Sequence, residues 1–275
     1  MEKNKLIITI AQTGSVPTRE NSPYAPLTPK EIVKDIVDCY DRGAVIAHTH
    51  ARDENEKPSH KLQYFKQIFD ELDKTGCPII RQISTTGRQV KDFKERCEAL
   101  DLLPPSCSFT TGSVNFANFI YENSPQLIQY FAERMYELKV KPEIEIFDTG
   151  MIQPALDLRK KGLLKDPLQF NFVMGIKGAM AATAKNLLHC LDMIPEGSLW
   201  QVSVVGDTHT QISTIAIALG GNVRVGVEDN IWYDREKGIK ASNTMLMDRI
   251  LGIAKAYGRE LATVEEAREI LKLEN

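Results

Sequence analysis

The sequence predicts a single (β/α)8 TIM barrel spanning residues 1–275, with a short extra helix at the C-terminal end. Short apolar runs alternate eight times with longer amphipathic stretches, and no Pro/Gly/Ser-rich linker divides the 275 residues. Eight strand–helix units in a chain of this length favour a closed parallel barrel. The alternative is an open doubly wound sheet. That alternative is weakened because the first apolar run lacks a G-x-G-x-x-G turn and no Walker-type loop is present.

The apolar runs and the amphipathic stretches between them give the expected elements in order. The expected strands are Leu6–Ala11, Val45–Thr49, Ile79–Ile83, Ser106–Thr110, Glu143–Phe147, Gln169–Val173, Leu199–Val204 and Asn222–Val227. The expected helices are Pro29–Arg42, Leu62–Lys74, Val90–Leu100, Pro125–Leu138, Gln153–Lys161, Thr183–Met193, Thr210–Leu219 and Asn243–Tyr257.

Several helix ends carry their own signals. Thr28 to Glu31 combines an N-cap threonine, a proline at the first helical position and a reciprocal glutamate. Thr263 to Glu266 repeats the capping box before the short terminal helix. Glycines stand where four helices are expected to stop, at Gly43, Gly76, Gly162 and Gly258.

Composition narrows the classes of function. The formal net charge is −3 with both signs spread along the chain, which disfavours nucleic acid as a partner. No apolar stretch approaches the roughly 18 residues of a membrane span, and the first apolar run is too short for a signal peptide. Five scattered cysteines without a C-x-x-C pair argue against a disulfide framework. We therefore expect a cytoplasmic protein.

The second expected strand ends in the motif H-x-H, formed by His48 and His50. Side chains two residues apart on a strand point to the same side, so both imidazoles can reach one metal ion. The carboxyl ends of the strands form the functional face of such a barrel. Structural or charge-pairing histidines are the alternative, but the pair at a strand end favours a metal site.

Glu228 is the candidate for a third ligand. It follows the eighth strand, and in a closed barrel that strand lies beside the first, which lies beside the second. A His/His/Glu set with open positions is typical of a catalytic metal site. An exposed loop carboxylate is the alternative interpretation.

Other strand ends carry further polar groups. The hydroxyl-rich segments beginning at Ser84 and Thr110 are suited to hold a carboxylate or phosphate, with ordinary turn chemistry as the alternative. Glu143 and Glu145 share one face of the fifth strand, where a buried carboxylate needs a metal or a basic partner. His209 follows the seventh strand and is either a residue of the barrel mouth or a structural one.

Several motifs together resemble the β-keto acid cleavage enzyme family over essentially the whole chain. They are T-G-S-V-P-T-R (Thr13–Arg19), L-T-P-K-E (Leu27–Glu31), A-H-T-H-A-R (Ala47–Arg52), Q-I-S-T-T-G (Gln82–Gly87), T-T-G-S-V-N-F (Thr110–Phe116), P-E-I-E-I-F-D-T-G-M (Pro142–Met151) and G-G-N-V-R-V-G-V-E-D-N (Gly220–Asn230). The last motif is the most specific, because it joins a proposed metal ligand to a proposed acid–base pair.

The resemblance implies a zinc-dependent (β/α)8 enzyme, with another divalent transition metal as the alternative, that assembles into homotetramers. Such enzymes convert a β-keto acid and acetyl-CoA into acetoacetate and a new acyl-CoA. Matched by motif, the residues fall into three groups. His48, His50 and Glu228 resemble the metal ligands. Asp229 resembles the general base, with Arg224 as its charged partner. Ser84, Thr110 and Glu145 resemble substrate-binding residues.

Two departures from the family pattern bear on the substrate. Val16 stands where members acting on 3-keto-5-aminohexanoate carry a glutamate for the amine, so we expect a substrate without that amine. The loop Val204–Thr210, which contains Gly206-Asp207-Thr208-His209, stands where many relatives have a G-I-G-R type loop. The role of this loop is therefore left open. The rival hypotheses are a CoA-independent metal-dependent aldolase or hydrolase on the same barrel, and a non-catalytic metabolite-binding barrel.

Overall fold

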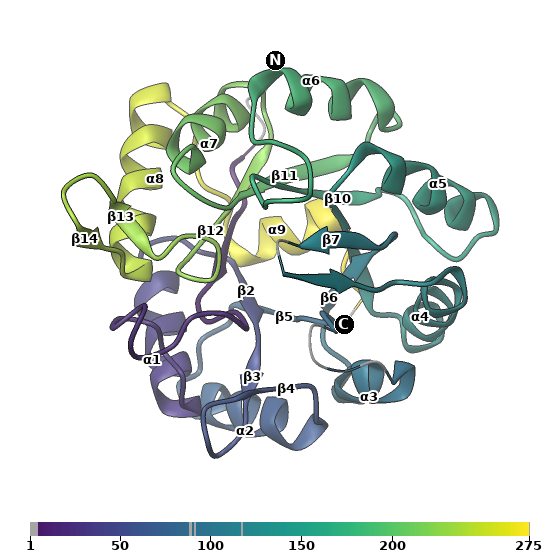
Figure 1. The fold of residues 1–275 in the computed structure, drawn as a ribbon, viewed down its shortest axis with the longest axis horizontal. Coiled ribbons are helices and arrows are strands. Elements are labelled where there is room, and N and C mark those ends of the chain that lie inside the picture. The colour runs from purple at the N-terminus through teal and green to yellow at the C-terminus, as the bar shows by residue number, and fades with distance from the viewer. Residues whose placement is uncertain (1–4, 88–89, 91, 117, 275) are drawn as a thin grey trace.

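The computed structural model describes residues 5–87, 90, 92–116 and 118–274, which form a closed barrel of eight parallel strands (Figure 1). Neighbouring strands follow the order β1-β12-β11-β10-β9-β6-β5-β2, and β2 closes the ring against β1. The predicted barrel is confirmed, with strand ends shifted by up to two residues. The strands are β1 (Ile8–Ala11), β2 (Ile46–Thr49), β5 (Ile80–Ile83), β6 (Ser106–Thr110), β9 (Lys141–Ile146), β10 (Gln169–Met174), β11 (Leu199–Val204) and β12 (Asn222–Val225).

Helices surround the barrel in the order that the sequence predicts (Figure 1). They are α1 (Pro29–Tyr40), α2 (Leu62–Asp73), α3 (Phe93–Cys97), α4 (Pro125–Leu138), α5 (Ile152–Lys160), α6 (Ala184–Met193), α7 (His209–Ala218), α8 (Asn243–Tyr257) and α9 (Val264–Leu271). Two 3-10 turns, η1 (Glu98–Leu102) and η2 (Thr149–Met151), adjoin α3 and α5. Among the described residues, no helix combines the length and apolar character needed to cross a membrane.

The predicted helix Val90–Leu100 differs most from the structure. Asp92 caps α3, because its side chain accepts from the backbone N–H groups of Lys94 and Glu95, so the helix begins at Phe93. From Glu98 onward the backbone tightens into η1. Lys91, inside the predicted range, lies outside the described residues.

The predicted end signals are confirmed. Thr28 and Thr263 both form full capping boxes with a glutamate three residues later. Gly258 adopts φ 74° at the C-terminal cap of α8, a left-handed conformation that glycine adopts without a steric penalty.

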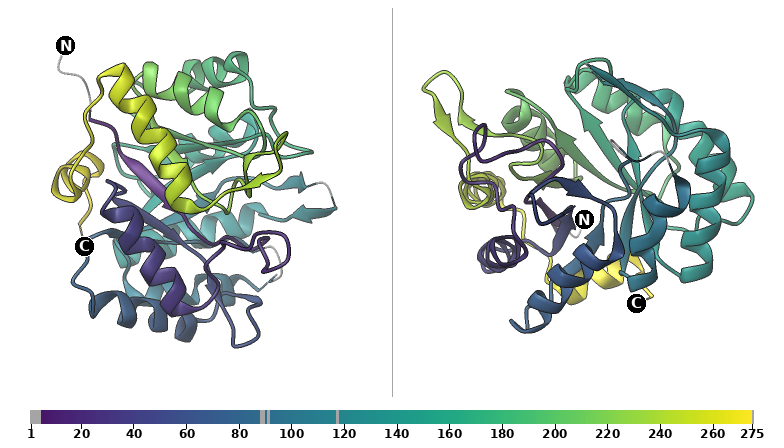
Figure 2. Two further views of the ribbon diagram at one scale, coloured as in Figure 1. Left: turned by 90° about the vertical axis from the view of Figure 1, so that its left-hand side faces the viewer. Right: turned by 60° about the horizontal axis from the view of Figure 1, so that its bottom comes forward.

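The terminal helix α9 closes the N-terminal end of the barrel. Val264, Ala267 and Leu271 pack with strand residues such as Ile46 and Ile80 in a separate apolar cluster. Figure 2 shows α9 at one end of the barrel and the β7–β8 hairpin projecting from the other. The opposite end, at the carboxyl ends of the strands, is therefore the end available to a ligand.

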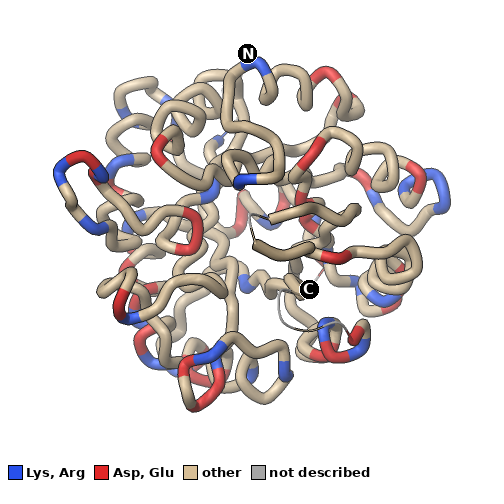
Figure 3. The backbone as a smooth tube through the Cα atoms, viewed as in Figure 1, with Lys and Arg blue, Asp and Glu red and all other residues tan. Residues whose placement is uncertain are grey.

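Three short hairpins that the sequence did not predict flank this open end. They follow β2, β6 and β12, and pair as β3 (Ala51–Arg52) with β4 (Pro58–Ser59), β7 (Val114–Phe116) with β8 (Phe119–Tyr121), and β13 (Trp232–Asp234) with β14 (Ile239–Lys240). Lys, Arg, Asp and Glu are intermixed around the outer ring of helices and loops (Figure 3).

Asn243, at the start of α8, ties together three elements at the mouth. Its Oδ1 accepts from Val227 N at 2.8 Å, and its Nδ2 donates to Gln12 O at 3.0 Å and to Asp35 Oδ2 at 2.5 Å. The side chain is fully buried. One amide side chain thus links three parts of the structure, namely the segment after β12, the residue that follows β1, and helix α1.

We expect Asn243→Ala to lower the free energy of unfolding by about 2–4 kcal/mol, because it leaves buried backbone groups without partners. Urea denaturation followed by circular dichroism measures this loss. Asn55→Ala is the matched control, since Asn55 is exposed, and it should change stability by less than about 0.5 kcal/mol. Equal effects of the two substitutions would contradict the assigned role.

Candidate functional site

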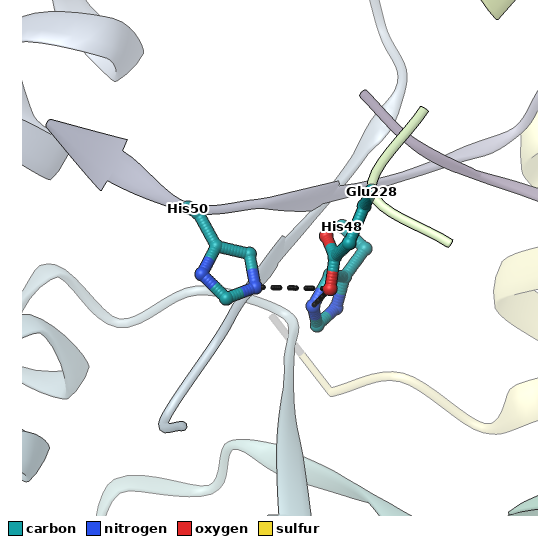
Figure 4. A group of neighbouring side chains, drawn as sticks. All are labelled: His48, His50 and Glu228. Carbon is teal, nitrogen blue, oxygen red and sulfur yellow. Dashed lines mark hydrogen bonds and ion pairs between the residues drawn. The ribbon is translucent and has the colours of Figure 1, made fainter. Parts of the chain in front are cut away.

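His48, His50 and Glu228 converge at the open end of the barrel (Figure 4). His48 lies in β2, His50 follows it, and Glu228 follows β12, with β1 pairing to both strands. Glu228 Oε1 is 3.1 Å from His50 Nε2 and 3.7 Å from His48 Nε2. One ligand atom from each residue lies within 4.8 Å of the other two. The structure thus brings together the three residues that the sequence singles out as metal ligands.

The hydrogen bonding of these residues suits a metal ion. His48 Nε2 and Glu228 Oε2 are buried and form no hydrogen bond within the described structure. His48 Nδ1 lies 2.6 Å from Gln82 Oε1, an oxygen that can only accept, so Nδ1 carries the proton and Nε2 keeps its lone pair. Two imidazole nitrogens and a carboxylate form a donor set suited to a divalent transition metal.

Arg224 is buried beside the proposed ligands and connects three carboxylates. It donates through Nε to Asp229 Oδ2 and through Nη2 to Asp229 Oδ1, both at 2.9 Å. Nη2 also donates to Glu228 Oε1 at 2.6 Å, and Nη1 lies 3.5 Å from Glu145 Oε1. Arg224 therefore fixes the position of Asp229 relative to Glu228.

The carboxyl groups around Arg224 differ in their acidity. Burial raises the pKa of Asp229 to about 6, although the Arg224 charge opposes the shift. Burial likewise raises the pKa of Glu145, again against Arg224. Burial would also raise the pKa of Glu228, but Arg224 and the two histidines hold it well below its usual range. Burial and then Arg224 lower the pKa of His48 to about 3, so its imidazole is neutral.

A pocket of about 370 Å³ opens above this cluster. Its polar and ionisable lining residues are His50, Glu145, Arg224, Glu228 and Asp229. Its apolar lining residues are more numerous, namely Val16, Phe116, Phe119, Phe147, Val173, Ile176, Val205 and Ile231. Ser15, Thr86 and Asn118 add uncharged polar groups. The pocket therefore combines the Arg224 cluster with a largely apolar lining.

Val16 reaches the pocket from the loop after β1, and two contacts fix this loop. Arg52 Nη2 donates to the carbonyl oxygens of Gly14 at 2.7 Å and Pro17 at 2.9 Å. Gly14 has φ 65°, and a Cβ at this position would lie 2.6 Å from Glu228 Cγ. The loop therefore packs directly against a proposed metal ligand, and only glycine at position 14 permits this close approach.

Ser84 and Thr110 lie one layer behind the pocket surface. Ser84 Oγ donates to Thr86 Oγ1 at 3.0 Å, and Thr86 lines the pocket. Thr110 Oγ1 donates to Glu145 Oε2 at 3.0 Å. Both residues thus reach the pocket through a neighbour, and their role in substrate binding stays a prediction.

Sequence reasoning missed Gln82 and the aromatic lining residues, and it included Thr86 only as part of the hydroxyl-rich segment that begins at Ser84. Gln82 stands two residues before Ser84, so the period-2 pattern of a strand was a signal for it. Phe116 and Phe119 lie on the unpredicted β7–β8 hairpin, with ring centroids 5.0 Å apart. Phe147 packs edge-on to Phe116 at 5.4 Å. Nothing in the local sequence signalled these aromatic residues.

His209 lies in another cavity, of about 540 Å³, between α7 and the β13–β14 hairpin. The side chain is buried, and residues such as Trp232 and Arg249 line the same cavity. Asp207 also lines it and pairs with Arg235 at 3.4 Å. The loop Gly206–Thr210 therefore adds no side chain to the pocket above the histidine pair.

The comparisons with known proteins agree with one another, and each covers nearly all of this chain. Residues 5–273 match the beta-keto acid cleavage enzyme family. The chain is 40% identical over 272 residues to the 3-keto-5-aminohexanoate cleavage enzyme of Fusobacterium nucleatum, covering 98% of each protein. It is 35% identical to the 3-oxoadipate:acetyl-CoA acetyltransferase of Cupriavidus necator, covering 97% of this chain and 94% of that one. A solved ternary complex of ObcA with a C4-CoA adduct and oxalate shares the fold, with a TM-score of 0.77. The similar region covers 91% of this chain and 68% of the ObcA chain, at 19% sequence identity.

We expect His50→Ala to weaken binding of Zn²⁺ or Co²⁺ by more than about 100-fold, since loss of an outer-shell partner alone typically costs 10–100-fold. Competition against a chromophoric chelator measures the affinity. His189→Ala is the control, because His189 is exposed on α6. Unchanged binding in His50→Ala would rule out this donor set.

Proposed function

Because the chain belongs to the beta-keto acid cleavage enzyme family, we propose that it condenses a β-keto acid with acetyl-CoA to give acetoacetate and a new acyl-CoA. The observation that carries the proposal is the buried Arg224–Asp229 pair, which lines one pocket together with His50 and Glu228 of the His/His/Glu set. The acetyl-CoA in the name of the Cupriavidus relative supports the second substrate.

His48, His50 and Glu228 would hold Zn²⁺ or another divalent transition metal. Such an ion acts as a Lewis acid on the keto oxygen and stabilises the enolate. The donor set supports this assignment, because His48 Nε2 and Glu228 Oε2 are buried without hydrogen-bond partners among the described residues.

Asp229 is the proposed general base. It removes a proton from the carbon between the keto group and the carboxylate, and Arg224 favours the charged carboxylate that does so. The two bonds from Arg224 hold both Asp229 oxygens in place, so the proton acceptor has a defined position in the pocket. Ser84 and Thr110 are proposed to place the substrate carboxylate, and Glu145 is proposed as a further substrate-binding residue of the barrel mouth; Thr86, which accepts from Ser84, lines the pocket itself.

The bonds formed and broken balance without a further reactant. The enolate carbon attacks the thioester carbon of acetyl-CoA, and CoA sulfur then moves from the acetyl carbon to the keto carbon of the adduct. The bond between the original α-carbon and keto carbon breaks in a retro-Claisen step, which gives the acyl-CoA. The carbanion of acetoacetate recovers its proton from Asp229.

The apolar lining residues of the pocket support a keto acid whose side chain is uncharged. The chain's relatives bear the names of 3-keto-5-aminohexanoate and 3-oxoadipate, so the side chain of the keto acid varies within the family. Val16, Phe116 and Phe147 offer only apolar contacts. An ammonium group packed against them would lose hydration and would receive no counter-charge from these side chains.

We propose a homotetramer in the cytoplasm. The family resemblance supports a homotetramer, which size-exclusion chromatography with light scattering would measure. All five cysteines lie within the described residues and form no disulfide, which supports a reducing compartment such as the cytoplasm.

We expect Asp229→Asn to lower kcat by at least about 1,000-fold while stoichiometric metal binding persists, because the amide keeps the shape but cannot accept the proton. Metal analysis and mass-spectrometric detection of acyl-CoA products check the two parts. Retained turnover would refute the assigned base.

A panel of β-keto acids with alkyl, neutral polar and amine-bearing side chains tests the substrate class. We expect alkyl substrates to lead in kcat/KM, and Val16→Glu to shift the amine-to-alkyl ratio by at least about 10-fold, or about 1.4 kcal/mol. Leu188→Glu, on the exposed surface of α6, is the control and should leave the ratio unchanged. Metal-loaded protein that makes no acyl-CoA with any substrate would favour the CoA-independent enzyme or the binding protein.

A further inference from the structure

A chain of hydrogen bonds runs from the proposed metal site into the barrel interior. Gln82 accepts from His48 Nδ1 at 2.6 Å, and its own Nε2 donates to Glu143 Oε2 at 3.1 Å and Ser106 Oγ at 3.2 Å. His48, Gln82 and Glu143 are all fully buried. Gln82, which lies in β5, thus connects β2 to β6 and β9.

Glu143 is the point on which three amide donors converge. Besides Gln82, Gln169 Nε2 donates to Oε2 at 2.7 Å and Asn171 Nδ2 donates to Oε1 at 3.2 Å. Asn171 in turn accepts from Ser203 Oγ at 2.8 Å. Each of these bonds points toward Glu143, so the carboxylate sets the direction of the chain.

The direction matters because a glutamine side chain has one donating end and one accepting end. Glu143 and Ser106 occupy the donating end of Gln82, which turns Oε1 toward His48. A histidine that faces an acceptor at Nδ1 carries its proton there. With Gln82 reversed, His48 would be protonated on Nε2 and could not coordinate through that atom.

We propose that Glu143 is a positioning residue for the metal centre. By accepting from Gln82, it selects the imidazole tautomer of His48 that leaves Nε2 free for a metal ion. This inference rests on the proposed metal site but not on the proposed reaction, so its test uses metal binding and histidine spectroscopy without any assay of turnover.

The first measurement is the tautomer of His48 in the metal-free protein, from long-range ¹H–¹⁵N correlations of ¹⁵N-histidine-labelled samples. His48→Gln assigns the signal. We expect the pattern of an Nδ1–H imidazole in the wild-type protein. A predominantly Nε2–H imidazole there would overturn the proposal, and this measurement depends on no substitution at position 143.

Substitutions then test whether Glu143 acts through Gln82. We expect Gln82→Leu and Glu143→Leu each to weaken Co²⁺ or Zn²⁺ binding by about 10–100-fold, with loss of the single tautomer. Because both act on one contact, the double variant should bind no more weakly than Gln82→Leu alone. Losses that add in the double variant would overturn the proposal.

Two further variants separate positioning from a general structural effect. Glu143→Gln keeps an oxygen for Gln82 if Asn171 turns its amide, so it should bind metal within about 3-fold of the wild-type protein. Gln201→Leu removes another buried interior amide, whose bond is to Thr9 rather than Gln82, and should leave metal affinity unchanged. A loss in Glu143→Gln as large as that in Glu143→Leu, or an equal loss in Gln201→Leu, would overturn the proposal.

Discussion

A guanidinium buried inside a barrel is strongly destabilising unless carboxylates surround it, and the grouping of Asp229, Glu228 and Glu145 around Arg224 follows from that requirement. The guanidinium of Arg224 is surrounded by both oxygens of Asp229, one oxygen of Glu228 and the nearby Glu145. Three carboxyl groups share one guanidinium, which can balance the negative charge of only one of them. A divalent cation beside the histidine pair would balance the remaining negative charge, so the arginine and the proposed metal stabilise the same cluster from two sides.

The barrel interior is polar where branched apolar side chains more often fill such a fold. Gln82, Glu143 and Asn171 form one buried network, and Thr9 and Gln201 a separate pair. The apolar packing that stabilises the molecule lies instead between the strands and the outer helices, and beneath the barrel at α9. This division leaves the interior available to orient the residues at the mouth.

The sequence predicted those features that depend on local pattern or on strand order. Apolar runs placed the eight strands, and the adjacency of the first, second and eighth strands brought Glu228 to His48 and His50. It did not predict the β7–β8 hairpin, whose Phe116 packs against Phe147, a residue 31 positions further along the chain. Gln82 was missed as a site residue since its role depends on partners in other strands.

Gly14 has a consequence for how such a pocket can diversify. Because the backbone at this residue touches Glu228 while Arg52 holds the flanking carbonyls, the loop has a fixed path. Residue 16 stands two positions away, half-exposed, and its side chain can change without moving that path. If residue 16 contacts the substrate as proposed, a single substitution there changes the substrate preference without moving the loop. A side chain at residue 14 would instead displace Glu228 and with it the proposed metal site, so the two positions are subject to different constraints.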